Sequence, residues 1–261
     1  ERCPDKTEVL GPIPSTRTMN ISNFNSIQKE FKSITDLEKA KIFSRFFKTG
    51  KGQYGYGDLF LGVNVPTTRS IAHKHFNTSF TELEKVLKSK YHEIRLCGLL
   101  ILVKKFINAT KEKDTKAQSK IYNFYIRNTK KINNWDLVDL SCYQIVGEFC
   151  YKNNKDNEII QLVKSSNMWE KRIGIVSAYA YLKNKNNKLI FKIAKMVFND
   201  KNDLIQKATG WMLRESGKRV SKEDLITFLK ENHKKMPRTM FRYSVEKLSK
   251  EEIKEIEKKQ V

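Results

Sequence analysis

The sequence predicts an all-α fold, a curved solenoid of HEAT-like helical repeats with a basic concave groove. Apolar residues recur at helical spacing from Phe24 onward, and no stretch shows the alternation of a strand. A short pattern also recurs, in which a basic residue precedes a glycine and an apolar run. Its period of about 35 residues is typical of two-helix repeats that stack into a solenoid.

The recurring pattern has three clear copies and one weaker copy that lacks the glycine. Glycine inside a helix costs about 1 kcal/mol relative to alanine, so its recurrence predicts close helix packing. The basic residues share one phase of the repeat, and we expect them to line one concave face that suits a long anion. The copies contain Arg95 and Gly98, Arg172 and Gly174, Lys207 and Gly210, and finally Arg242.

The elements follow in order from the first methionine, Met19. Residues 1–18 carry three prolines and no apolar periodicity, so we expect a leader or an expression remnant without ordered structure. Residues 19–261 then form a single helical-repeat domain. An amphipathic helix ends near Lys48, a glycine-rich loop covers 49–65, and Pro66 opens the next helix, where its missing N–H costs nothing. Further helices are predicted near 80–90, 92–109, 116–128, 134–151, 157–165, 169–183, 186–198, 202–217, 221–232 and 237–248.

The charge of the chain indicates its class of partner. Lysine and arginine total 51 against 29 aspartate and glutamate, a formal net charge of +22. An excess of this size is typical of proteins that bind nucleic acid or an anionic membrane. A membrane is disfavoured, because the longest apolar run, 96–103, is far too short to span a bilayer and no signal-peptide pattern is present. We therefore expect an intracellular monomer (cytoplasm or nucleoid, or the nucleus of a eukaryote) that binds duplex nucleic acid.

Neither the cysteines nor the histidines predict a metal site, and we expect no cofactor. The cysteines form no C-x-x-C pair, and three of them fall in apolar helical stretches, so we interpret them as reduced, buried thiols. The pair His73-x-His75 lies on a basic helix without a carboxylate or thiol nearby. The four cysteines are Cys3, Cys97, Cys142 and Cys150.

The segment Gly50–Gly55 matches the G-x-G-x-x-G spacing of dinucleotide-binding loops. It follows a predicted helix rather than a strand, which disfavours a dinucleotide site. We interpret it as a mobile basic loop that brings Lys48 and Lys51 to a nucleic-acid backbone. The helix opened by Pro66 offers N–H groups beside Arg69, and these suit one phosphate.

Three tryptophans, Trp135, Trp169 and Trp211, fall at or near the starts of predicted repeat helices. Each of them alone is typical of a core residue. Residues four apart share one face of a helix, so Trp135 and Asp139 project together. An aromatic plate beside a carboxylate, in so basic a chain, indicates chemistry on a polyanion.

The two aspartates of this segment differ in how easily they are explained. Asp136 complements the dipole at a helix N-terminus. Asp139 lies one turn deeper, where a capping role does not cover it. The alternative to a functional role for Asp139 is a structural salt bridge to a neighbouring arginine, for which Arg172 is the candidate.

Four segments, in order and at compatible spacing, are 60–69, 135–139, 169–172 and 210–215. Together they resemble the AlkD family of DNA alkylation-repair glycosylases, and the similarity spans about residues 40–248. The resemblance implies a HEAT-like solenoid that cups duplex DNA, excises positively charged N3- and N7-alkylated purines and leaves an abasic site. It also implies that the family acts without a pocket enclosing the base.

By this resemblance, Asp139 takes the position of the family's catalytic aspartate. Trp135 and Trp211 match the tryptophans that flank the sugar and backbone of the lesion, and Arg172 matches a DNA-contacting arginine. Phe46 stands where the type member has tyrosine, so the aromatic face is kept and the hydroxyl is lost. The residues expected to contact DNA are Phe46, Lys48, Lys51, Arg69, Arg172 and Arg214.

A purine alkylated at N3 or N7 is already cationic and can leave without protonation. The enzyme then needs no general acid, which agrees with the absence of a histidine near these motifs. An anionic Asp139 stabilises the oxocarbenium-like sugar of the transition state and can orient or deprotonate the attacking water. No lysine is clearly placed as a Schiff-base nucleophile, so we expect a monofunctional glycosylase without strand cleavage.

Two other functional classes remain open. A non-catalytic HEAT-like scaffold that binds nucleic acid explains the basic groove equally well, and Phe46 slightly favours it. The carboxylate kept inside the basic groove favours the enzyme. A solenoid that binds an acidic protein is the third class, which competition by duplex DNA would distinguish.

Overall fold

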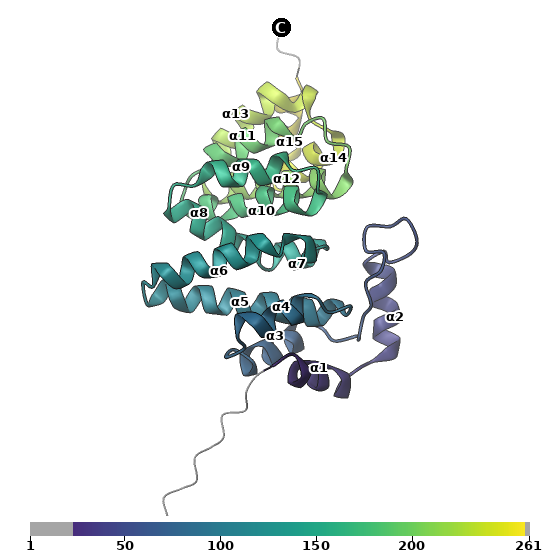
Figure 1. Ribbon diagram of the computed structural model, residues 1–261. Helices are drawn as coiled ribbons and strands as arrows, with labels where there is room; N and C mark the ends of the chain where they lie inside the picture. Colours follow the sequence, from purple (N-terminus) through teal and green to yellow (C-terminus); the bar gives the residue numbers. More distant parts are fainter. Residues whose placement is uncertain (1–22, 259–261) are drawn as a thin grey trace, which may run out of the picture.

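Layers of helices stack along the chain from α1 to α15 in the computed structural model, which describes residues 23–258 (Figure 1). Within that range the regular elements are helices, and the one bridge between extended residues joins Leu59 to Tyr91. The prediction of an all-α helical-repeat fold is confirmed. The leader predicted over residues 1–18, together with Cys3, lies outside the described residues.

The N-terminal half is organised around the long helix α5, against which α3, α4 and α6 pack. Helix α2 and the loop after it stand at one side of this stack and reach toward α7 (Figure 1). The bounds are α1 (Phe24–Ser33), α2 (Leu37–Phe46), α3 (Val65–Lys74), α4 (Phe80–Leu87), α5 (His92–Lys111), α6 (Thr115–Arg127), the 3-10 turn η1 (Thr129–Lys131) and α7 (Trp135–Asp139).

The C-terminal half is organised around α10 and α12, which pack on each other. Helices α7 and α9 cover α10, and α11, α13 and α14 cover α12. The bounds are the π-helical turn η2 (Tyr143–Gly147), α8 (Glu148–Lys152), α9 (Asp156–Lys164), α10 (Met168–Lys183), α11 (Lys188–Met196), α12 (Asp203–Arg219), α13 (Lys222–Asn232), the 3-10 turn η3 (His233–Lys235), α14 (Arg238–Ser244) and α15 (Lys250–Glu257).

Helices α7, α10 and α12 are each capped at the N-terminus by an asparagine. The side-chain oxygens of Asn134, Asn167 and Asn202 accept a hydrogen bond from the first backbone N–H groups of the helix that follows. An asparagine cap satisfies an N–H group that would otherwise lack a partner, typically worth about 1 kcal/mol. These caps recur with the repeat, and they fix the starts of the three helices that carry the tryptophans.

The recurring glycines allow neighbouring helices to approach closely, as predicted. A Cβ atom on Gly174 would lie 2.9 Å from the Ile159 carbonyl oxygen of α9, and one on Gly210 would lie 2.5 Å from the Met240 carbonyl oxygen of α14. Such distances are shorter than van der Waals contact. An alanine at either position would therefore push the two helices apart.

The single helix predicted over 134–151 is wrong, because α7 ends at Asp139 and a turn separates it from the π-helical turn and α8. The hydroxyl of Ser141 donates to the Leu137 carbonyl at 2.6 Å and pairs with the Tyr125 hydroxyl at 2.8 Å. A side chain that bonds the backbone locally competes with the helical ladder. The break leaves Asp139 at a helix end rather than in a helix interior.

One buried core runs through both halves. Cys97, Cys142 and Cys150 lie in it as unpaired thiols, as predicted. Burial raises the pKa of the Cys150 thiol to about 12. None of the helices within residues 23–258 combines the length and the apolarity needed to cross a bilayer.

Candidate functional site

A groove of about 740 Å³ runs along α7, α10, α12 and α14 and is closed on one side by α2 and its loop. Four cationic side chains line it against a single carboxylate, that of Asp203. Six of the predicted site residues meet there, namely Phe46, Lys48, Trp135, Arg172, Trp211 and Arg214. The structure thus brings together residues that lie up to 168 positions apart in the chain.

Trp135 is the first residue of α7 and is held from the side of α2. Its ring stacks on Phe47 with 5.3 Å between centroids and meets Phe46 edge-on at 5.9 Å. Its indole N–H donates to the Tyr54 hydroxyl at 3.3 Å, so the glycine-rich loop contacts the site. Phe46 is 62% exposed, which leaves its face open to the groove.

The other two tryptophans differ from each other in burial, and Trp169 lies near the start of its helix as predicted. Trp169 is 8% exposed and belongs to the core, where it meets Tyr54 edge-on. Trp211 lies in the middle of α12 rather than at its start, so the expected placement at the beginning of a repeat helix is wrong. It still reaches the groove, because α12 lines the groove from Asp203 to Arg214.

Asp139 forms a two-pronged ion pair with Arg172. The guanidinium donates to the carboxylate from Nε at 3.0 Å and from Nη2 at 2.7 Å, and its Nη1 donates to the Leu204 carbonyl. Burial raises the pKa of Asp139, and the guanidinium offsets part of that increase. The salt bridge that was the alternative role of Asp139 is therefore present. Arg172 lines the groove, whereas Asp139 lines a second cavity that shares Phe46 and Trp135 with it.

Four of the basic residues singled out in the sequence do not line the groove, namely Lys51, Arg69, Arg95 and Arg242. Lys51 is exposed on the loop, and Arg69 is exposed on α3, where it lines a separate depression with His73. Arg95 is buried, and it donates to Asp58 at 2.7 Å and to the Ser89 carbonyl at 2.9 Å. The expectation that the basic residue of every repeat lines one face is therefore wrong, because a buried carboxylate captures Arg95.

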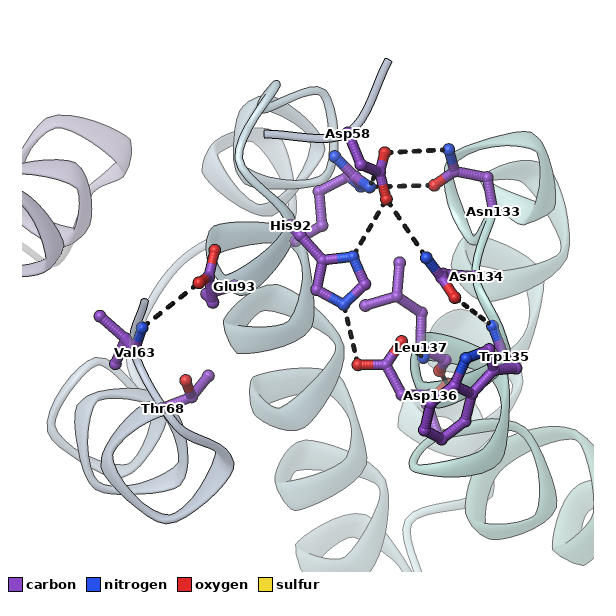
Figure 2. A network of polar contacts seen from close by, with 12 residues as sticks. Asp58, Val63, Thr68, His92, Glu93, Asn133, Asn134, Trp135, Asp136 and Leu137 are labelled. Carbon is purple, nitrogen blue, oxygen red and sulfur yellow. Dashed lines mark hydrogen bonds and ion pairs between the residues drawn. The ribbon is translucent and has the colours of Figure 1, made fainter. Parts of the chain in front are cut away.

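His92 was missed by the sequence analysis, and the expectation that no histidine lies near the motifs is wrong. Figure 2 shows the imidazole between two carboxylates, with Nδ1 3.1 Å from Asp58 and Nε2 2.8 Å from Asp136. Burial would lower the pKa of His92, but Asp136 and Asp58 together raise it to about 9. A protonated His92 therefore connects the end of the glycine-rich loop to the residue next to Trp135.

The segment before α3 is fixed by a second buried carboxylate, that of Glu93. It accepts hydrogen bonds from the backbone N–H groups of Leu61 and Gly62 at 2.9 Å and of Val63 at 3.3 Å. Gly62 has φ +78°, and a Cβ atom there would lie 2.1 Å from the Asp36 carbonyl oxygen. The segment 60–69 is therefore mainly architectural, since it anchors α2 beside the site.

Comparison with known proteins identifies the family of the chain. The sequence profile of a family described as "DNA alkylation repair enzyme" matches residues 27–248, which is most of the chain. This protein belongs to the DNA alkylation repair enzyme family. The four segments that carry the AlkD resemblance lie within the matched range. A comparison with curated proteins found no match.

Two of the solved structures that are similar to this DNA alkylation repair family member come from Enterococcus faecalis and Streptococcus mutans. A predicted DNA alkylation repair enzyme from Enterococcus faecalis has a TM-score of 0.63 and 17% identity, over 83% of this chain and 97% of that one. The protein smu.31 from Streptococcus mutans UA159 has a TM-score of 0.47 and 17% identity, over 85% and 95% of the two chains. At this identity, the first likeness supports the fold alone.

Proposed function

We propose that this member of the family is a monofunctional DNA glycosylase. It excises cationic N3- and N7-alkylated purines from duplex DNA by hydrolysing the N-glycosidic bond. It acts as a monomer inside the cell. The observation that carries the proposal is the position of Asp139, a carboxylate beside Trp135 at the edge of a cationic groove.

In this proposal the groove binds the DNA backbone. Lys48, Arg172, Lys207 and Arg214 line it, and cations of this kind neutralise phosphates. Arg172 has five N–H donors and gives three hydrogen bonds to Asp139 and Leu204, so further N–H groups can face a phosphate. A phosphate bound there would share the guanidinium with Asp139 and place the sugar next to the carboxylate.

The chemistry then follows from the charge of the substrate. An alkylated purine cation leaves without a general acid, and His92 cannot serve as one, because it is 2% exposed between two carboxylates. Positive charge develops on the sugar as the bond breaks. Asp139 stabilises that charge and orients the attacking water, while Trp135 and Trp211 pack against the deoxyribose.

The alternative is a non-catalytic scaffold that binds nucleic acid. Two observations favour it: the Asp139 carboxylate is occupied by Arg172, and Phe46 supplies no hydroxyl. Binding of an acidic protein by the same groove is a third possibility. Competition by duplex DNA for the bound protein would separate that reading from the other two.

The test is release of free N7-methylguanine and N3-methyladenine from methylated duplex DNA. We expect release by the parent protein and a loss of about 10² to 10³ in rate for Asp139→Asn, with duplex binding retained. Asp203→Asn is the matched control, because Asp203 is a carboxylate that lines the groove itself and pairs with Lys207 there. Binding without release by the parent would favour the scaffold, and equal release by all three would remove Asp139 from the mechanism.

A further inference from the structure

The glycine-rich loop folds back over the end of α2 and brings Tyr54 to the groove (Figure 1). The backbone N–H of Gly55 donates to the Lys48 carbonyl at 3.1 Å. A Cβ atom on Gly55 would lie 2.4 Å from the Phe47 carbonyl oxygen, so glycine is required for this close approach. Tyr54 and Lys48 are therefore held together at one wall of the groove.

The far end of the loop is anchored independently of Tyr54. Asp58 is buried, lies 3.1 Å from the His92 ring, and accepts hydrogen bonds from Arg95 at 2.7 Å and from Asn133 at 3.3 Å (Figure 2). These contacts fix the loop on the side of α5 and α7. A change confined to the Tyr54 hydroxyl should therefore leave the path of the loop intact.

The Tyr54 side chain lies between two tryptophans. Its ring meets Trp169 edge-on, with 6.0 Å between centroids, and its hydroxyl accepts the Trp135 indole N–H at 3.3 Å. An indole N–H is a donor only, so this contact does not use the phenolic proton of Tyr54. Within residues 23–258 that proton has no acceptor. The hydroxyl is therefore a donor that a ligand in the groove can use.

The surroundings of the hydroxyl favour an anionic ligand. Lys48 lines the groove beside Tyr54, and three further cationic side chains line it from α10 and α12. Asp203, the carboxylate that lines the groove, is paired with Lys207. Tyrosine hydroxyls, like lysine and arginine, are common donors to the phosphate oxygens of DNA.

We propose that Tyr54 is a DNA-contacting residue, whose hydroxyl donates a hydrogen bond to a backbone phosphate next to Trp135. The inference rests on the proposed function and adds a residue to its binding site. Phe46 packs against the same indole, with 5.9 Å between ring centroids, but it has no hydroxyl. The loop therefore supplies a donor that the end of α2 lacks.

The contact connects the phosphate to the tryptophan that packs against the deoxyribose. The Trp135 indole donates to Tyr54, and Tyr54 donates to the phosphate, so each hydrogen bond polarises the next. A backbone contact carries no information about the base. Tyr54 should therefore strengthen binding of damaged and undamaged duplex equally, and selectivity for the lesion stays with its chemical reactivity.

The test compares the affinities of the parent and Tyr54→Phe for one duplex with and without methylation, by fluorescence anisotropy. The substitution keeps the ring and its contact with Trp169. We expect both affinities to fall about tenfold, in the range for a hydrogen bond to a charged group. Tyr56→Phe is the matched control and should bind like the parent, because Tyr56 is 65% exposed on the same loop and does not line the groove. Equal affinities of Tyr54→Phe and the parent would overturn the inference.

Duplexes with a single methylphosphonate locate the contact. This linkage is neutral and replaces one anionic oxygen with a methyl group. In the parent, one position near the target should weaken binding about tenfold, and the same position should cost Tyr54→Phe much less, because the two changes remove one interaction. If every position costs both proteins the same, Tyr54 acts only through Trp135, and the phosphate contact is wrong.

The rate of base release gives a further distinction between a DNA contact and a structural role. With the DNA saturated by protein, Tyr54→Phe should release bases at close to the parent rate, because a backbone contact stabilises substrate and transition state alike. A lower saturating rate at unchanged affinity would mean that Tyr54 positions Trp135 instead, and would overturn the inference.

The outcome is separable from that of the proposed function. Loss of duplex affinity in Tyr54→Phe, in a protein whose parent releases no base, would support the contact and contradict the glycosylase. Base release by a parent whose affinity for DNA does not depend on Tyr54 would overturn the contact alone.

Discussion

Helix α7 carries two carboxylates, Asp136 and Asp139, in opposite surroundings. Asp136 lies in a closed network, in which its partner His92 is itself held by Asp58 on the far side (Figure 2). Asp139 pairs with Arg172, which lines the groove and also donates to the Leu204 carbonyl. Two residues of one type, three positions apart, therefore have different partners: that of Asp136 is enclosed by a second carboxylate, and that of Asp139 lines the groove.

The presence of an ion pair does not by itself show whether an aspartate has a structural or a functional role. Both aspartates are ion-paired, so the existence of the pair cannot distinguish them. The surroundings of the cationic partner do distinguish them. A partner enclosed by a second carboxylate is part of the architecture, and a partner that faces a groove can exchange its contacts with a phosphate.

Disrupting the network of His92, Asp58 and Asp136 should cause a large loss of stability. His92→Gln leaves Asp58 and Asp136 buried without the cation between them, so we expect the free energy of unfolding to fall by about 3 kcal/mol. Chemical denaturation measures the change. His73→Gln is the matched control, because His73 is exposed on α3 and its replacement should cost less than about 0.5 kcal/mol. Equal losses in the two variants would show that the network does not hold the fold.

A pH titration probes the same network without a mutation. The folded pKa of His92 is about 9, above its ordinary 6.5, so its contribution to stability is fully present below pH 6.5 and is lost as the pH rises through 9. We expect the parent to lose up to about 3 kcal/mol over this interval relative to His92→Gln. The difference between the two stability curves isolates this residue from the lysines that titrate at higher pH. Parallel curves would contradict a protonated His92.

Of these changes, a substitution at Phe46, which lines the groove, should have the smallest effect. Phe46→Tyr restores the hydroxyl of the family's type member on an exposed ring, so stability should not change. One additional hydrogen bond to DNA is worth about 0.5–1.5 kcal/mol, so we expect duplex affinity or the rate of base release to rise about threefold. Filter binding and single-turnover kinetics measure the two quantities. A loss of stability would show that the Phe46 ring is instead needed for packing.

The fold was predictable from the sequence because it depends on local patterns. Helical spacing of apolar residues and recurring glycines predicted the layers, and the helix expected over 169–183 matches α10, Met168–Lys183. The break after Asp139 was not predictable, since it depends on Ser141 meeting Tyr125 from another helix. The asparagine caps at the starts of α7, α10 and α12 recur visibly in the sequence and could have marked the repeat more sharply.

The candidate site was predictable only in part. The aromatic and basic residues of the groove were identified from their motifs, and six of them do meet. Arg95 and Arg172 belong to corresponding segments of the repeat and are both buried, yet Arg95 does not line the groove, because it pairs with Asp58 from a loop 37 residues earlier. His92 pairs with residues 34 and 44 positions away, a distance over which no spacing rule operates. The second cavity likewise exists only once α2 has packed beside α7.

The most direct measurement compares Asp139→Asn with Asp136→Asn, using single-turnover base release and unfolding free energy on each. We expect each variant to lose mainly a different property. Asp139→Asn loses about 10² to 10³ in rate and, because the freed Arg172 guanidinium still lines the groove, less stability than Asp136→Asn. Asp136→Asn loses about 3 kcal/mol of stability and releases bases at close to the parent rate under conditions where it is folded. If both variants lose rate and stability together, the two carboxylates belong to one unit, and the assignment of a structural role to Asp136 and a catalytic role to Asp139 is wrong.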